Sequence, residues 1–89
     1  MNVVHNTAEQ RFECEVDGLL CVAAYRLTGR VTHITHTEVP EALSGRGIAA
    51  QLVAAALAHA RLSNLKVNPV CSYVRAYMQR HCETHTLYA

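Results

Sequence analysis

The sequence contains no tryptophan, only two prolines, and no long hydrophobic run. No apolar stretch approaches the roughly 20 residues that a membrane-spanning helix needs, and the first residues lack the hydrophobic segment of a secretion signal. Eight basic and seven acidic side chains give a formal net charge of +1. The basic residues form no run, which argues against a large nucleic-acid footprint. We therefore expect a cytoplasmic protein that binds neither nucleic acid nor membrane.

What is present suits one small folded domain. Hydrophobic residues make up 51% of the 89 residues, which is enough for a single packed core over residues 1–89. A core of this size is marginal, so we expect a monomer or a weak homodimer. Without a secretion signal, the four cysteines are expected to be reduced thiols rather than a disulfide framework.

Two glycine-containing turns divide the N-terminal half into three expected strands. Residues 11–16 alternate apolar and charged side chains, and residues 19–27 and 31–39 continue the strand-like pattern. The turns are short, so the three strands are expected to form an antiparallel meander. Residues 1–10 are polar and unpatterned, and we expect a loose N-terminus there.

The first turn, Asp17-Gly18, sets the register between the first two strands. Both residues tolerate the positive φ that a type I′ turn requires. Cys14 and Cys21 then lie opposite each other. They form either a redox pair or two small core residues in facing positions.

The pattern becomes helical in the second half. Apolar residues recur on one stripe over residues 46–62, between many alanines. Residues 65–70 form a short strand, and Pro69 within it predicts an edge or a strand that diverges from its neighbour. Ser72 is placed to cap a last helix over residues 73–82. The order β-β-β-α-β-α predicts an α+β, or mixed α/β, fold with one sheet and two helices.

A glycine turn, Gly45-Arg46-Gly47-Ile48-Ala49, joins the third strand to the first helix. Its backbone N–H groups and the positive end of the helix could converge on a phosphate or pyrophosphate, and the arginine side chain could add charge. Alternatively, it is a tight loop that uses glycine only for its φ range. The turn lacks the Lys-Ser or Lys-Thr of a P-loop and the last glycine of the dinucleotide fingerprint.

Four further residues carry potential chemistry. Cys71 lies between a strand end and a helix start, where a thiol pKa is lowered; alternatively it is a small buried residue. Glu38 and His36 share a strand face just before the glycine turn, and either could take a proton. The alternative is a solvated face with a hydrogen-bonded histidine. Tyr77 is on the inward stripe of the last helix, either as a core aromatic or as an acid for a leaving group.

The histidines do not predict a metal site. His33 and His36 are three apart, and such residues face opposite sides of a regular strand. His81, Cys82 and His85 could meet on one helical turn, but no second pair of ligands has a suitable spacing.

Three segments, taken together and in this order, closely resemble the very short N-acetyltransferase-domain-like branch of the GNAT acyltransferase superfamily. They are His36-Thr37-Glu38-Val39-Pro40, Gly45-Arg46-Gly47-Ile48-Ala49 and Pro69-Val70-Cys71-Ser72-Tyr73-Val74. The resemblance extends from about Phe12 to His81, which is most of the chain.

The resemblance implies an acetyl-CoA-binding fold reduced to its central strands and two helices. It implies that Gly45, Arg46, Gly47, Ile48 and Ala49 hold the pyrophosphate of coenzyme A. The pantetheine arm then lies along the strand of Thr37, Glu38 and Val39, in a wedge where this strand and the one ending at Val70 diverge. Cys71 corresponds to a cysteine near the CoA sulfur, as an acetyl acceptor or as part of the lining. The superfamily pattern begins with Gln or Arg where this chain has Ser44, a change that leaves the backbone N–H groups unaffected.

The resemblance therefore implies an acetyl-CoA-dependent N-acetyltransferase that moves an acetyl group to an amine, directly or through Cys71. In that mechanism Glu38 or His36 helps to deprotonate the amine, and Tyr77 protonates the CoA thiolate. The first alternative is a module that binds CoA or acyl-CoA with little catalysis. The second is a small interaction domain whose glycine turn is purely structural.

Overall fold

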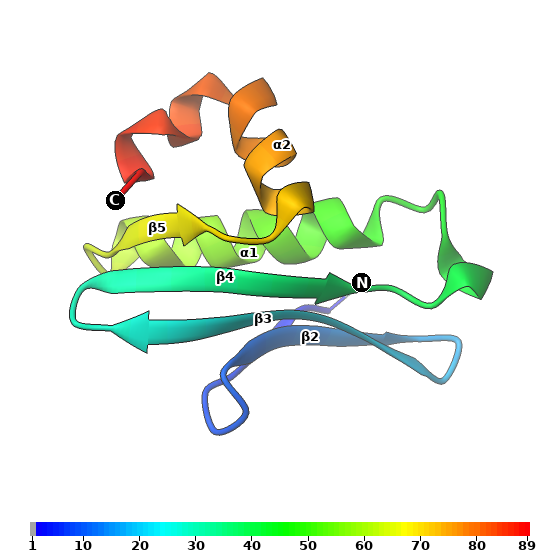
Figure 1. The fold of residues 1–89 in the computed structure, drawn as a ribbon. Coiled ribbons are helices and arrows are strands. Elements are labelled where there is room, and N and C mark those ends of the chain that lie inside the picture. Colours follow the sequence, from blue (N-terminus) through cyan, green and yellow to red (C-terminus); the bar gives the residue numbers. More distant parts are fainter. Residues whose placement is uncertain (1) are drawn as a thin grey trace.

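The computed structural model describes residues 2–89, which form one five-stranded sheet and two main helices. The strands are neighbours in sequence order, antiparallel from β1 to β4, with β5 parallel to β4 (Figure 1). The strands are β1 (Val4–Asn6), β2 (Arg11–Val16), β3 (Leu19–Thr28), β4 (Val31–Glu38) and β5 (Lys66–Pro69). The helices are η1 (Glu41–Leu43, 3₁₀), α1 (Ile48–Leu62), α2 (Ser72–Arg80) and η2 (Cys82–Leu87, 3₁₀). This architecture confirms the predicted α+β fold with its meander, diverging strand and two helices.

The N-terminus differs from its prediction. Residues 1–10 were expected to be loose, and Met1 lies outside the described residues, but β1 pairs antiparallel with β2. His5 of β1 stacks on Phe12 with 4.1 Å between ring centroids, and its Nε2 lies 2.6 Å from the hydroxyl of Tyr25. A strand of three residues is too short to show an alternating pattern, and its order comes from these contacts with other strands.

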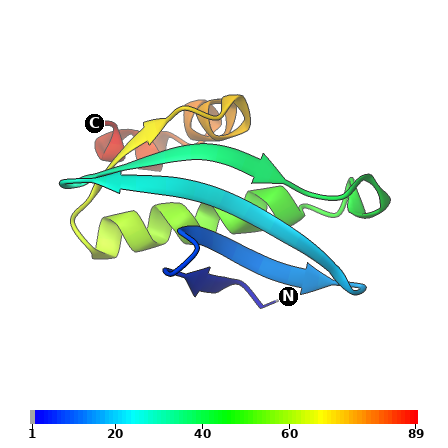
Figure 2. The ribbon, with the colours of Figure 1, turned by 60° about the horizontal axis from the view of Figure 1, so that its bottom comes forward.

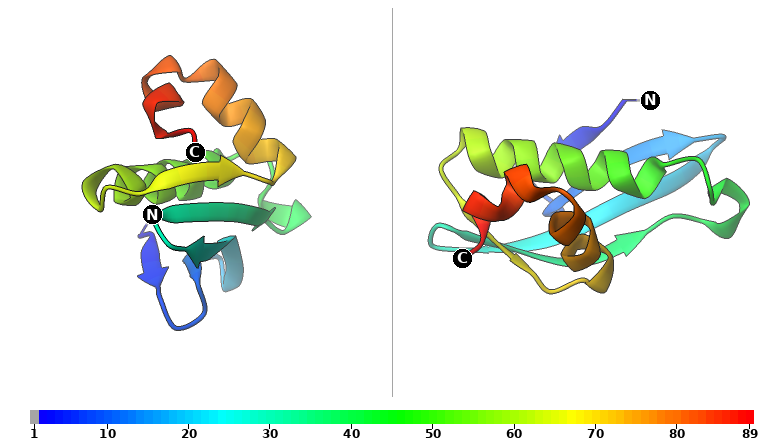
Figure 3. Two further views of the ribbon diagram at one scale, coloured as in Figure 1. Left: turned by 60° about the vertical axis from the view of Figure 1, so that its left-hand side comes forward. Right: turned by 90° about the horizontal axis from the view of Figure 1, so that it is seen from above.

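One hydrophobic core lies between the sheet and the helices. Helix α1 crosses the sheet, and α2 with η2 packs beside α1 near β5 (Figures 1 and 3). Leu52 and Val53 of α1 are fully buried, as are Val74 and Met78 of α2, and all four belong to the same core. No helix within residues 2–89 combines the length and apolar character needed to cross a bilayer.

The Asp17-Gly18 turn has the geometry predicted for it. Asp17 has φ 53° and Gly18 has φ 76°. The turn places Cys14 opposite Cys21, and both are buried in the core as thiols. The structure thus confirms the predicted facing register of these two residues.

A β-bulge at Thr35 changes the faces of β4. Ile34 pairs with Tyr25 and His36 pairs with Ala24, so Thr35 has no opposite residue on β3. The extra residue shifts the side-chain alternation by one position. His33 and His36 consequently lie on the same face, and the prediction that they face opposite sides is wrong.

The sheet face opposite α1 is not covered by any helix of residues 2–89 (Figures 1 and 2). Beyond the bulge, His36 and Glu38 point to this open face and are exposed, whereas Thr37 points to the helical side and is partly buried. The bulge therefore decides which residues of β4 can reach the groups carried by α2.

Candidate functional site

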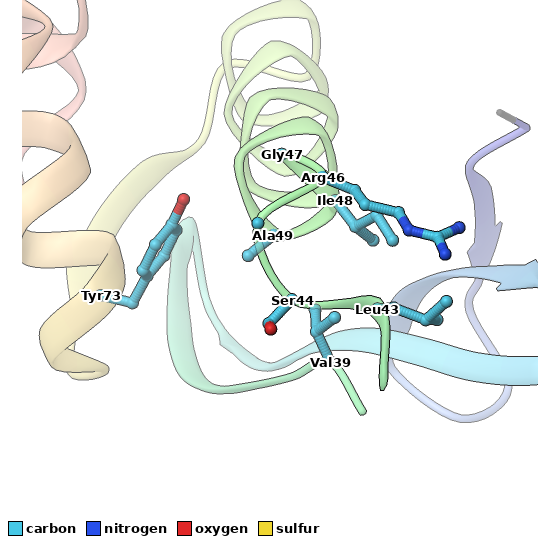
Figure 4. Close-up of a pocket in the computed structure, with 9 residues that line it drawn as sticks. Val39, Leu43, Ser44, Arg46, Gly47, Ile48, Ala49 and Tyr73 are labelled. Atoms are coloured by element: carbon cyan, nitrogen blue, oxygen red, sulfur yellow. The ribbon is translucent and has the colours of Figure 1, made fainter. Parts of the chain in front are cut away.

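The glycine turn forms a pocket of about 260 Å³ where β4 leads into α1 (Figure 4). Pro40 has no N–H to continue the β4 ladder, and η1 follows it. Gly45 has φ 80° and Gly47 has φ 75°, a backbone region that glycine occupies without strain. The pocket is lined by Val39, Leu43, Ser44, Gly45, Arg46, Gly47, Ile48, Ala49 and Tyr73.

The backbone N–H groups of this turn have no acceptor within the part of the chain that the structure describes. Within residues 2–89, no hydrogen bond is donated by the N–H of any residue from Gly45 to Ala49, and the first helical bond runs from Gln51 N–H to Gly47. No side chain caps α1. The positive end of a 15-residue helix and five backbone donors without a partner in residues 2–89 therefore belong to the lining of this pocket.

The Arg46 side chain points away from this pocket. Its Nη1 lies 3.0 Å from Oδ2 of Asp17, in the β2–β3 turn. Figure 4 shows the guanidinium on the side opposite Tyr73. The Arg46 guanidinium, which the sequence suggested as a phosphate ligand, is thus paired with the carboxylate of Asp17.

Strands β4 and β5 diverge beside the pocket. Their pairing ends at Ile34 and Pro69, and the last backbone contact runs from Cys71 N–H to Ile34 O, at 2.9 Å. The N–H of Val70 turns back to Asn68 instead. Past this point β4 has a strand neighbour only on its β3 side, which leaves backbone donors and acceptors available on its other side.

Cys71 lies where the two strands separate. It is the N-cap of α2, a position predicted for Ser72, and it is partly buried. Its Sγ is 3.6 Å from Oγ1 of Thr37. Burial alone would raise the pKa of the Cys71 thiol, but the backbone of Val74, the Thr37 hydroxyl and the backbones of Tyr73 and Thr37 together hold this pKa below its ordinary value.

The two candidate bases are separated from this thiol by β4 itself. His36 Nε2 and Glu38 Oε1 lie 3.6 Å apart on the open face, with 59% and 69% of their side chains exposed. Thr37 lies between them in sequence and faces Cys71 on the other side. A proton acceptor on this face would act on a group that enters past the edge of β4.

The two tyrosines of α2 occupy different places. Tyr77 stacks on His81 with 4.0 Å between ring centroids and lines a separate pocket between α1 and η2. Burial, Glu83 and Tyr73 raise the pKa of Tyr77. Tyr73, one turn earlier, lines the glycine-turn pocket (Figure 4).

Sequence reasoning missed Tyr73 and Leu43 as lining residues. Tyr73 stands in the same short segment as Cys71, and this proximity to the start of α2 was the signal for it. Leu43 is 1% exposed and fixes η1 against the core. Among residues 2–89, no group of three or more histidine, cysteine or carboxylate side chains could hold a metal ion.

Known proteins resemble this chain in sequence and in fold. A family model described as GCN5-related N-acetyl-transferase matches residues 11–87. Protein NATD1 of Mus musculus is 33% identical over 84 residues, which cover 91% of this chain and 76% of that protein. Protein NATD1 of Homo sapiens is also 33% identical over 84 residues, covering 91% and 74%. The solution structure of a GCN5-like candidate N-acetyltransferase from Staphylococcus aureus has a TM-score of 0.79 and 26% identity, covering 99% of this chain and 87% of that one.

Proposed function

The chain belongs to the GCN5-related N-acetyltransferase family, and we propose that it transfers the acetyl group of acetyl-CoA to an amine. The observation that carries this proposal is the set of unpaired N–H groups from Gly45 to Ala49 at the start of α1. Such groups bind phosphate without needing a basic side chain. The donor set therefore fits the pyrophosphate of CoA.

The rest of the donor substrate follows from the arrangement around the pocket. Val39 and Tyr73 line the pocket on the side toward the divergence of β4 and β5. The pantetheine arm would use the unpaired edge of β4, as another strand would. This path leads the thioester toward Thr37 and Cys71, which are in contact at the divergence.

In the direct route, the nitrogen of the amine attacks the carbonyl carbon of the thioester. A backbone N–H on the free edge of β4 is suited to stabilise the oxyanion. Collapse forms the amide bond, breaks the carbon–sulfur bond and releases the CoA thiolate. The amine proton passes to Glu38 or His36, through water on the open face. We propose Tyr73 for thiolate protonation, because Tyr77 lines the other pocket.

In the covalent route, the Cys71 thiolate attacks the thioester first. The acetyl group moves to Sγ, and CoA leaves as a thiolate that takes up the proton lost from Cys71. The amine then attacks the acetyl carbonyl, the bond between this carbon and Sγ breaks, and the amine proton returns to the Cys71 thiolate. The lowered pKa of Cys71 supports this route, because the thiolate is the nucleophile.

Acetyl-CoA turnover with a panel of amines tests the proposal, and Cys71→Ala separates the routes. The direct route predicts that turnover survives the substitution. The covalent route predicts that turnover is lost, together with a +42 Da acetyl adduct (about the mass of the added C₂H₂O group) seen by mass spectrometry on the wild type. Tight CoA binding without transfer to any amine would instead indicate a CoA-binding module.

A further inference from the structure

Arg46 is the charged residue among those that line the glycine-turn pocket, and its side chain already has a partner. Asp17 accepts from its guanidinium at 3.0 Å, across 29 positions of sequence. A phosphate bound by the turn would lie beside the backbone of Arg46, and the guanidinium would have to leave Asp17 to reach it. The ion pair therefore connects the β2–β3 turn to the pocket.

The two partners are not equally free to move. Asp17 belongs to a two-residue turn closed by the β2–β3 ladder, so its backbone is held by the sheet and its side chain is short. Arg46 lies between two glycines of positive φ, and its own N–H makes no hydrogen bond within residues 2–89. Arg46 is thus the partner that can turn toward a ligand.

We propose that Asp17 is a positioning residue that competes with the pyrophosphate of CoA for Arg46 and so lowers the affinity of the pocket. This inference rests on the proposed function. Both side chains are more than half exposed, at 52% and 64%, so the pair is weak and readily exchanged. A pyrophosphate offers more negative charge and paired acceptor oxygens, which suit the guanidinium fork better than one carboxylate oxygen does.

Calorimetric titration of CoA into the wild type, Asp17→Asn, Arg46→Gln and the double variant tests this exchange. Asparagine tolerates the positive φ of position 17, so the turn is kept. We expect Asp17→Asn to tighten CoA binding about two- to fivefold, the range of an exposed ion pair. Arg46→Gln should weaken binding, and the double variant should match Arg46→Gln. The gain from Asp17→Asn should shrink in high salt.

Glu41→Gln is the matched control, because it removes an exposed carboxylate near the same turn that has no ion pair within residues 2–89. An equal gain from this control, or a gain from Asp17→Asn that persists without Arg46, would show a general charge effect and overturn the exchange. Unchanged or weaker binding by Asp17→Asn would also overturn it. Loss of the gain with dephospho-CoA would overturn the assignment to pyrophosphate. A wild type that binds no CoA would contradict the proposed function as well.

Discussion

The sulfur of Cys71 and the hydroxyl oxygen of Thr37 lie 3.6 Å apart at the point where β5 diverges from β4. Two features of the fold produce this contact. The bulge at Thr35 turns Thr37 to the helical side, and the end of β5 places Cys71 at the N-cap of α2. The contact joins the two sides of the divergence through which the pantetheine arm is proposed to pass.

Thr37→Val should raise the pKa of the Cys71 thiol. The substitution removes a hydroxyl that favours the thiolate, while keeping the shape of the side chain. The pKa is measured from the rate of alkylation by iodoacetamide as a function of pH. Thr37→Ser retains the hydroxyl and serves as the control. An equal alkylation profile for the valine and serine variants would show that the hydroxyl does not act on the thiol.

His5 should make the fold less stable in mild acid. Burial, and then the nearby charge of His59, lower the pKa of His5 in the folded state. The unfolded chain therefore binds this proton more readily, so stability is lost as the pH falls through about 6.5, the unperturbed value, and the loss ends below the folded pKa.

The measurement is the melting temperature between pH 7.5 and 5, values on either side of roughly pH 6.5. His5→Phe keeps a ring against Phe12 but cannot titrate, so its melting temperature should fall less steeply. Parallel slopes for the wild type and His5→Phe would contradict this assignment.

Gly47→Ala should destabilise the fold through backbone strain alone. A Cβ at position 47 meets nothing within 4 Å, but φ is +75°. The left-handed conformation costs alanine about 1–2 kcal/mol of folding stability. Each kcal/mol lowers the melting temperature by roughly 4–8 °C in a domain of this size. Gly47→Asn should cost less, because asparagine adopts this conformation more readily. Denaturant unfolding measures both; equal losses would point to a cause other than φ.

The local features of this fold could be predicted from the sequence because each depends on a few neighbouring residues. The Asp17-Gly18 turn and the glycine turn before α1 needed only the φ preferences of their residues. The family assignment depended on short segments in a fixed order, and the fold and the family model agree with it.

The features that were missed depend on distant contacts. β1 is ordered by pairing with β2 and by the contacts of His5, which its own three residues do not reveal. The bulge at Thr35 is visible only in the register of β4 against β3. Simple alternation along β4, without a bulge, places His33 and His36 on opposite faces. Which of Tyr73 and Tyr77 lines the glycine-turn pocket depends on how α2 docks against α1, because the two residues lie one helical turn apart.

The most direct test is an NMR titration of the ¹⁵N-labelled protein with CoA, following each backbone amide. We expect the largest shifts at Gly45, Arg46, Gly47, Ile48 and Ala49, with smaller ones at Thr37 and Cys71, because the five turn amides gain phosphate acceptors that they lack in the free protein. Shifts confined to other parts of the chain, or none at saturating CoA, would contradict this expectation.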